Sequence, residues 1–520
     1  MLDPSVTRFA PNGMVSTIDH LATAAGVDLL RRGGSAVDAA IGANAVLSVT
    51  SSHMCGMGGD LWALVHFDDS APPATLDASG RAGSGADPER ARADGLTSIP
   101  LTGDVRAVTV PGAVDGWLAL HERFGRLPLA DVLAAAVALA EEGFPVAPLL
   151  AFMAPDVAHV EYSELPPAPV AGQRVTRPGS ARALRAIAAN GRDGFYGGEF
   201  GEGLLAAGPR EFSAADLEHS QARWVDPISV EAFGHTIWSP PPTSQGYLTL
   251  LGAAIADGFE VTADGAGIHV LIEAAAQAAH DRPTQLFEGA DPAVLLGGDR
   301  VAERRRAIDA ERAGHVGVPE WPGDTTYLCA VDRDGMGVSL INSNAKGFGA
   351  GIIAGTSGIF LHDRGLGFSL EPGHPAEYRA GHRPPHTLSP ALVTHSDGRL
   401  RTVLGTMGGD TQPQIVLQML AASLLHDQDP GRVLRAGRWK IAPADDGGGF
   451  DTWRAGHGRE IRVEDHVDRE IVDGLIERGH AVRVAHSSEF GHAHLIEVTE
   501  HGSLAGAADP RALTGAASGY

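Results

Sequence analysis

The chain has 520 residues, of which 43 % are hydrophobic, and a formal net charge of −24. A chain this acidic repels nucleic acid and anionic membranes, so we expect neither as a partner. No stretch approaches the ~18 uninterrupted apolar residues of a membrane span. The first residues also lack the basic and apolar regions of a secretory signal, so the sequence predicts a cytoplasmic protein.

The first third of the chain predicts helices followed by strands. Helical spacing of apolar residues indicates helices over 21–30 and 36–49, and Ser35 is a suitable N-cap for the second. Short strands are expected at 61–67 and 75–78, the latter running into a turn at Gly80-Arg81.

Further helices are expected at 113–123, 129–142, 248–257, 268–280 and 414–425, while strands dominate after Thr325. This periodicity indicates an α+β fold. Cys55 and Cys329 stand far apart and are interpreted as buried apolar fillers. Histidines such as His53 lack a set of further ligands, so the sequence predicts no metal and no cofactor.

Two glycine-containing stretches carry the chemical signal. The first, Gly323-Asp324-Thr325-Thr326-Tyr327, enters a run typical of a buried strand. A threonine opening a strand is ordinary, because β-branched residues favour strands. The second, Gly405-Thr406-Met407-Gly408-Gly409-Asp410, contains adjacent glycines whose N–H groups can be approached closely, as an oxyanion hole requires.

Threonine becomes a useful nucleophile only if a base removes its proton. Cleavage between Asp324 and Thr325 would give Thr325 a free α-amine, whose reference pKa is about 7.7–8.0. That amine can serve as the base, so no separate histidine is required. By sequence logic alone Thr326 is an alternative first residue.

The chain resembles the γ-glutamyltransferase family of N-terminal-nucleophile hydrolases along nearly its whole length. The matching motifs, in the expected order, are Asp19-His20-Leu21-Ala22, Arg31 to Ala40, Gly56-Met57-Gly58-Gly59-Asp60, Val110-Pro111-Gly112, Phe144-Pro145-Val146, Ser239 to Ser244, Thr325-Thr326 and Asp509-Pro510-Arg511 through Tyr520. The family pattern selects Thr325 as the nucleophile.

The resemblance implies a four-layer αββα sandwich and self-cleavage into a large subunit, 1–324, and a small subunit, 325–520. The two subunits would form one intertwined domain, and such pairs could assemble further into a homo-oligomer. A small-molecule substrate is the expected partner.

The resemblance also implies several site roles. The family places an arginine at the position of Arg81 to hold a substrate carboxylate, although a lone arginine in a turn is more often a solvated residue. Ser343 stands where relatives carry a threonine bonded to the nucleophile; a polar turn is the alternative. Gly408 and Gly409 match the oxyanion glycines.

Other positions depart from the family pattern. Ala345 replaces a substrate-binding asparagine, although a bulge could bring Asn344 into that role. Arg364 and Gly367 stand where relatives hold the donor's α-ammonium with polar or acidic residues. His386-Thr387 replaces a pair of serines.

These departures predict an altered donor, because an arginine repels an ammonium and attracts a carboxylate. We therefore expect a divergent, acylase-like hydrolase or acyltransferase acting on an anionic amide, of γ-glutamyl or glutaryl type. Two alternatives stay open: hydrolysis of a C–C bond in an oxo-acid of antibiotic biosynthesis, and a non-catalytic binding protein on the same fold.

Overall fold

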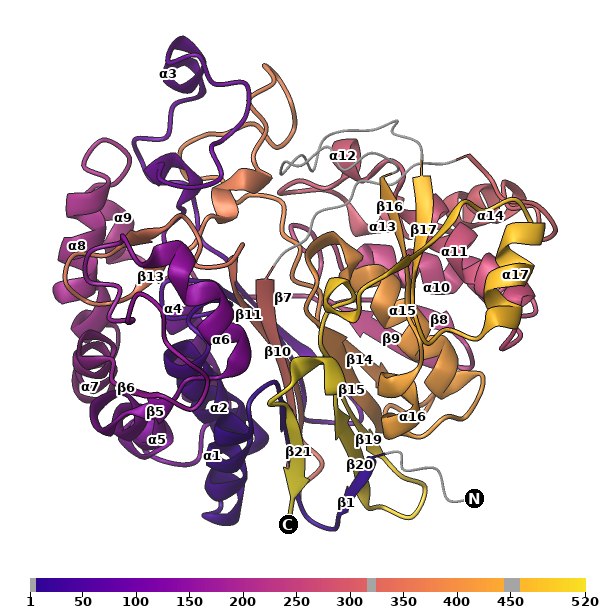
Figure 1. Cartoon of the computed structure of the whole chain (residues 1–520), viewed down its shortest axis with the longest axis horizontal. Helices are drawn as coiled ribbons and strands as arrows, with labels where there is room; N and C mark the ends of the chain where they lie inside the picture. The colour runs from indigo at the N-terminus through magenta and orange to yellow at the C-terminus, as the bar shows by residue number, and fades with distance from the viewer. Residues whose placement is uncertain (1–5, 316–323, 444–458) are drawn as a thin grey trace.

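Two sheets of seven strands each face one another at the centre of the computed structural model (Figure 1). The structure describes residues 6–315, 324–443 and 459–520. Every described strand pairing within these two sheets is antiparallel.

Both sheets are built from segments far apart in sequence. The first sheet contains, in order across it, β21 (Ala516–Gly519), β2 (Met14–Thr17), β10 (Asp324–Val331), β11 (Gly337–Ala345), β3 (Asp60–His66), β4 (Ala74–Ala78) and β7 (Arg223–Val225). The second contains β1 (Arg8–Ala10), β20 (Leu504–Ala508), β19 (Ala493–Val498), β15 (Leu400–Thr406), β14 (Ala391–Thr394), β9 (His235–Ser239) and β8 (Ile228–Ala232). Residues on both sides of position 324 therefore complete each sheet.

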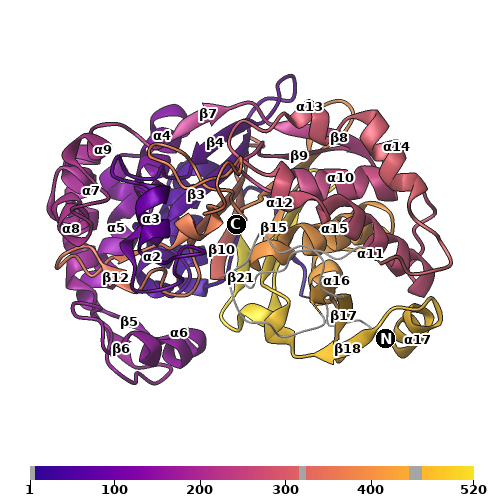
Figure 2. The same ribbon diagram turned by 90° about the horizontal axis from the view of Figure 1, so that it is seen from above.

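Helices cover the outer face of each sheet, as Figure 2 shows from above. The first sheet is covered mainly by α1 (His20–Arg31), α2 (Ala36–Thr50), α4 (Ala113–Phe124), α5 (Leu129–Glu142), α7 (Pro178–Tyr196) and α8 (Glu199–Ala207). The second is covered by α10 (Tyr247–Ala256), α11 (Gly265–Ala279), α15 (Gln412–Leu424) and α16 (Pro430–Arg435), with α14 (Gly298–Arg306) and α17 (Arg469–Glu477) outside them.

The remaining elements are short. They are α3 (Pro88–Ala93), α6 (Pro148–Met153), α9 (Ala214–Glu218), α12 (Arg282–Gln285), α13 (Pro292–Leu295), β5 (Phe144–Pro145), β6 (Arg174–Val175), β12 (Ile352–Ile353), β13 (Phe360–Leu361), β16 (Trp439–Pro443), β17 (Arg459–Glu464), β18 (Val482–Ala485) and the 3₁₀ turns η1 (Val105–Ala107), η2 (Ala154–Val157), η3 (Arg364–Gly367), η4 (Gly409–Thr411), η5 (Ser487–Glu489) and η6 (Pro510–Ala512).

A separate apolar core fills the space between the two sheets. Trp62, Tyr327 and Ile341 from the first sheet pack against Leu392 and Val403 from the second. With the outer cores this makes four layers, so the predicted αββα sandwich is confirmed. None of the described helices is both long and apolar enough to cross a bilayer.

A bulge distorts the first sheet where β10 begins. Asp324 pairs with Ala345 and Thr326 with Asn342, so β11 carries one more residue than β10 over this interval. Ala345 takes the left-handed conformation, with φ 75°. The bulge lies opposite Thr325 and lets Ser343 turn its side chain toward that residue.

Candidate active site

Thr325 lies at the start of β10 with its side chain fully buried. Its Oγ1 is 3.1 Å from the Oγ of Ser343, on the bulged end of β11. Side chains alternate along a strand, and the Oγ1 of Thr326 instead donates to the Asn342 carbonyl at 3.3 Å. The two threonines of the pair therefore face different surroundings.

The Ser343 hydroxyl also contacts the peptide bond that precedes Thr325. Ser343 Oγ donates to the Asp324 carbonyl oxygen at 2.9 Å. Ser343 Oγ itself accepts the Ala345 N–H at 2.8 Å and an N–H of Arg364 at 3.3 Å. Because these donors occupy its lone pairs, the single proton of Ser343 is left for either the Asp324 carbonyl oxygen or Thr325 Oγ1.

Arg364 is a buried cation beside these hydroxyls. Its Nη1 donates to Thr387 Oγ1 at 2.9 Å, and its Nε has no hydrogen-bond partner among the described residues. No carboxylate in the described part of the chain lies within ion-pair distance of it. Burial lowers the pKa of Arg364 to about 10, against the attraction of Asp60, Asp363 and Asp410, so the guanidinium is charged at neutral pH.

Gln245 joins this cluster to the second glycine motif. Its Nε2 donates to the Thr387 carbonyl and to the Gly409 carbonyl, both at 2.9 Å. A continuous path of hydrogen bonds therefore runs from Thr325 through Ser343, Arg364, Thr387 and Gln245 to Gly409. The structure thus brings together residues from β10, β11, η3 and the turn before α15.

The turn at Gly408-Gly409 needs glycine at both positions. Their φ angles are 135° and 57°, in the region that side chains disfavour. A Cβ on Gly408 would lie 2.6 Å from Thr411 Oγ1. Neither N–H has an acceptor in the part of the chain that the structure describes.

His386, expected to bind substrate, is engaged with the protein instead. Its Nε2 donates to Asp60 Oδ2 at 3.0 Å, and its Nδ1 accepts the Leu388 N–H at 3.3 Å. Burial, with the nearby Arg364 charge, lowers the pKa of His386 to about 4, so the ring is neutral. Burial opposes ionisation of Asp60, but His362, His386 and Arg364 outweigh it and lower that pKa to about 2.

Asn344 and Arg81, two further candidate binding residues, differ in their contacts with the protein. Asn344 Nδ2 donates to the Ser52 carbonyl at 3.1 Å, and its buried Oδ1 takes no hydrogen bond from the described residues. Arg81 is half-buried, and the described residues offer its guanidinium neither a hydrogen bond nor an ion pair. Of these two, only Arg81 presents a free charge.

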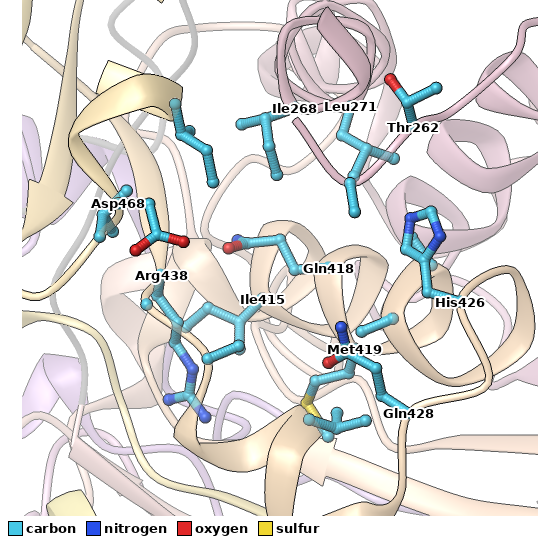
Figure 3. A pocket seen from close by; sticks show the side chains of 18 of the residues that line it. Thr262, Ile268, Leu271, Ile415, Gln418, Met419, His426, Gln428, Arg438 and Asp468 are labelled. Carbon is cyan, nitrogen blue, oxygen red and sulfur yellow. The ribbon is translucent and has the colours of Figure 1, made fainter. Parts of the chain in front are cut away.

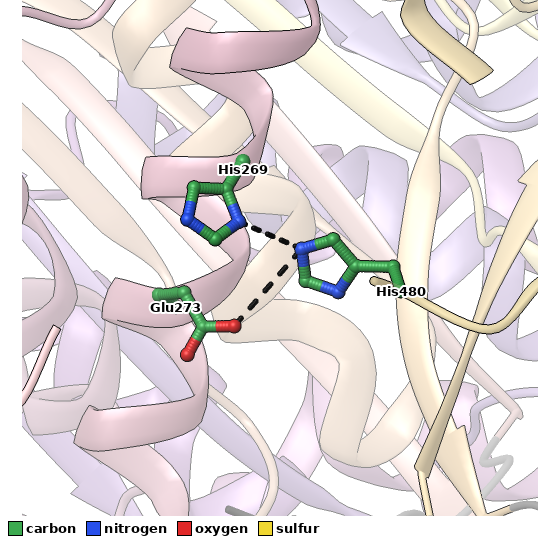
Figure 4. Close-up of side chains that lie close together, drawn as sticks. All are labelled: His269, Glu273 and His480. Carbon is green, nitrogen blue, oxygen red and sulfur yellow. Dashed lines mark hydrogen bonds and ion pairs between the residues drawn. The ribbon is translucent and has the colours of Figure 1, made fainter. Parts of the chain in front are cut away.

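One buried group has the ligand types of a metal site, namely His269, Glu273 and His480 (Figure 4). Its atoms are already bonded within the protein. His269 Nδ1 lies 2.8 Å from His480 Nε2 and its Nε2 lies 2.8 Å from the Asp309 carbonyl. Glu273 pairs with Arg459, which an ion would have to displace. We therefore assign no ion to this group.

One apolar cavity is lined by none of the residues around Thr325. It has a volume of about 250 Å³ and lies among α11, α15 and the start of α17 (Figure 3). Ile268, Leu271, Ile415 and Met419 give it apolar walls. The amide of Gln418 points inward but is bonded to the Gln414 and Trp439 carbonyls. None of the expected site residues lines this cavity.

Comparison with known proteins assigns a family to this geometry. The model of the family described as Gamma-glutamyltranspeptidase matches residues 22–519. The chain belongs to the gamma-glutamyltranspeptidase family. The resemblance found in the sequence is thereby confirmed.

Several relatives of this gamma-glutamyltranspeptidase-family chain are similar over their whole length. The glutathione hydrolase-like YwrD proenzyme of Bacillus subtilis (strain 168) is 33% identical, over 96% of this chain and 97% of that protein. The oxamate amidohydrolase proenzyme of Klebsiella pneumoniae is 33% identical, over 99% of each. The crystal structure of cephalosporin acylase from Bacillus halodurans matches with a TM-score of 0.90 and 33% identity, over 100% of this chain and 98% of that one.

These relatives establish the general activity. They are hydrolases, and the curated ones are named as proenzymes. The chain is therefore an enzyme, a self-processing hydrolase made as a precursor, and the non-catalytic alternative falls.

Three residues of the cluster were missed by sequence reasoning. Asp60 belongs to a recognised glycine motif, and Gln245 directly follows the proline–serine segment, so both stood next to a signal. Arg282, which bonds to Gln245, lies in α12 where no motif marks it. The motifs show where the chain turns, but they do not show which side chains meet.

Proposed function

We propose that the chain cleaves itself between Asp324 and Thr325 and then uses Thr325 as an N-terminal nucleophile on an anionic small-molecule amide. The observation that carries this proposal is the Ser343 hydroxyl, which contacts both Thr325 Oγ1 at 3.1 Å and the Asp324 carbonyl oxygen at 2.9 Å. One residue thus touches both the nucleophile and the bond that must break.

In the processing step, Thr325 Oγ1 attacks the Asp324 carbonyl carbon. Ser343 stabilises the negative charge that develops on the carbonyl oxygen. The peptide C–N bond then breaks as the proton released by the Thr325 hydroxyl passes to the nitrogen, which leaves Asp324 joined to Thr325 Oγ1 by an ester and gives Thr325 a free α-amine. Water hydrolyses the ester and gives subunits 1–324 and 325–520.

In turnover, the neutral α-amine of Thr325 accepts the proton of its own hydroxyl. Oγ1 attacks the substrate amide, and the N–H groups of Gly408 and Gly409 bind the resulting oxyanion. The proton passes to the leaving amine, and an acyl ester on Thr325 remains. Water or a second amine then releases the acyl group.

The charge of the substrate follows from two arginines. Arg364 is buried against the hydroxyls of Ser343 and Thr387 without a carboxylate within ion-pair distance in the described chain. Arg81 is half-buried, and its guanidinium has no ion-pair partner among the residues that the structure describes. A guanidinium binds a carboxylate through parallel hydrogen bonds, so the site favours an anionic acyl group that lacks an α-ammonium, such as a glutaryl group.

Intact-mass analysis of the purified protein tests the proposed cleavage directly. We expect two fragments that correspond to residues 1–324 and 325–520, with activity rising as the fragments accumulate. A fully active preparation containing only the unbroken chain would overturn the proposal, because the amine base exists only after cleavage.

A further inference from the structure

The turn that carries Gly408 and Gly409 rests on a buried arginine from a distant part of the chain. We propose that Arg282, acting through Gln245 and Asp410, holds this turn in the position that stabilises the oxyanion, and is thus a positioning residue of the reaction. The inference rests on the proposed function, because it takes the N–H groups of the two glycines to be the oxyanion donors.

The first connection runs through Gln245. Arg282 Nε donates to Gln245 Oε1 at 3.1 Å. Arginine has no acceptor, so this bond fixes which end of the amide faces it. The two hydrogens on Nε2 are then directed to the carbonyls of Thr387 and Gly409, both at 2.9 Å. Arg282 thereby sets the spacing between the oxyanion turn and the segment that bonds Arg364.

The second connection is an ion pair. Arg282 Nη2 lies 2.8 Å from Oδ1 of Asp410, the residue that follows Gly409. Arg282 therefore contacts the turn by two routes: through Gln245, which bonds the Gly409 carbonyl, and directly at the side chain of Asp410. Fixing both points prevents the peptide between them from rotating.

Fixed carbonyls also fix the N–H groups. A trans peptide is planar, with its C=O and N–H pointing in opposite directions. Met407 O accepts the Thr406 hydroxyl at 2.8 Å, and Gly408 O accepts the Thr411 hydroxyl at 2.7 Å. The N–H groups of Gly408 and Gly409 are therefore aimed away from these contacts. Gln245, held by Arg282, bonds the third carbonyl, that of Gly409, and so restrains the next peptide of the turn, whose N–H belongs to Asp410.

The surroundings strengthen this support. Arg282 is 1% exposed and Gln245 is fully buried. Apolar side chains from three helices, Leu248, Ala275, Ala279 and Leu417, lie around the pair of Arg282 and Asp410. An ion pair away from water is stronger, and removal of one partner leaves an uncompensated charge. The turn is therefore expected to shift when Arg282 is replaced.

The test compares Arg282→Met with Arg177→Met in protein that has completed self-cleavage. Arg177 is a matched control because it is also 1% exposed and pairs with a carboxylate, that of Glu164, at 3.3 Å. No hydrogen bond among the described residues links it to the Gly408-Gly409 turn. We expect Arg282→Met to lower kcat by about 10- to 100-fold with KM within about twofold, because displaced oxyanion donors act on the transition state. Arg177→Met should lower Tm but keep kcat within about twofold.

Two further variants keep the test decisive if Arg282→Met fails to fold. Arg282→Lys retains the ion pair but not the bond to Gln245, so it should recover part of kcat. Gln245→Met removes the bridge and should lower kcat to a similar extent as Arg282→Met, again without raising KM.

The inference is overturned if the Arg282 and Gln245 variants lose no more kcat than Arg177→Met, or if only KM changes. This outcome is distinct from failure of the proposed function. If Thr325→Ala is inactive while Arg282→Met is fully active, the nucleophile stands and only the positioning role falls. If Thr325→Ala is active, both the assignment of Thr325 as nucleophile and the positioning role of Arg282 are wrong.

Discussion

Arg282 and Arg364 are two fully buried arginines linked through Gln245 and Thr387, and they differ in whether a carboxylate lies beside them. Arg282 has a carboxylate, Asp410, at 2.8 Å. Arg364 has only the hydroxyls of Ser343 and Thr387, with no carboxylate within ion-pair distance in the described chain. Removing a charge from water costs several kcal/mol unless a partner compensates. The charge of Arg282 is thus used by the fold, and we infer that the charge of Arg364 serves a substrate anion.

Thr325→Ala should have the largest effect, because both arginines act on chemistry that starts at this hydroxyl. We expect no self-cleavage and a loss of activity of roughly 10⁴-fold or more. Thr325→Ser should retain part of both. Gel analysis of processing, together with steady-state kinetics, measures the two losses.

Thr326→Ala is the control for this variant. Its hydroxyl bonds the Asn342 carbonyl rather than Ser343, so the effect should be mild. An inactive Thr326→Ala beside an active Thr325→Ala would reverse the assignment within the pair.

Gly408→Ala should displace the Gly408-Gly409 turn, which we propose that Arg282 holds in place. With φ at 135°, and Thr411 Oγ1 2.6 Å from the new Cβ, the turn must move. We expect kcat to fall by about 10²- to 10³-fold, the range found when one oxyanion donor is lost. As a control, Gly335→Ala changes a positive-φ hairpin glycine whose Cβ meets nothing within 4 Å and should leave kcat unchanged. Equal effects would contradict a specific role for the turn.

Arg364→Gln should weaken recognition of the carboxylate of the donor. The wild type is expected to hydrolyse a glutaryl donor with a higher kcat/KM than the γ-glutamyl donor of the same leaving group. The substitution should lower kcat/KM for the glutaryl donor by about 10- to 100-fold, as loss of a charged hydrogen bond does. A neutral acyl donor should change little, which controls for damage to Ser343.

A wild type that strongly prefers the γ-glutamyl donor would contradict the role given to Arg364. A double variant that combines Arg364→Gln with an acidic residue at position 367 is unsuitable. A Cβ added at Gly367 would lie 2.5 Å from the Pro385 carbonyl oxygen. The arginine should therefore be tested by itself.

Asp363→Asn should have the smallest effect, and it tests the protonation state of the carboxyl group next to Arg364. Burial raises the pKa of Asp363 to about 7. Between its ordinary value of 3.8 and about 7 the folded chain holds a proton that the unfolded chain has released, so stability falls as pH rises through this range. The asparagine variant should lack this part of the slope in Tm between pH 4 and pH 7. Parallel Tm profiles would contradict the raised pKa.

Local signals in the sequence were sufficient for much of the fold. Ser35 caps α2 with its Oγ 3.1 Å from the Asp38 N–H, in the reciprocal arrangement of a capping box. The strand entered at Thr325 is β10, and the helix expected at 414–425 is α15. Such features depend on neighbours in sequence, so spacing and residue type reveal them.

The site could be predicted only in part, because its contacts join distant segments. The motifs predicted roles for Thr325, Ser343 and the glycine pair, and the structure places Ser343 against Thr325. His386 and Asp60, 326 residues apart, meet only because the strands and loops converge in three dimensions. The support from Arg282 has no local pattern, since its role depends on where α12 packs.

The most direct test of the account is to trap the acyl-enzyme and locate it. The processed enzyme is mixed with a donor whose acyl-enzyme is hydrolysed slowly. The reaction is quenched in acid, the protein is digested, and the acylated peptide is sequenced by mass spectrometry. The account predicts an acyl group on the side chain of Thr325, as the first residue of the small subunit. An acyl group on any other residue, or turnover without a covalent intermediate, would contradict it.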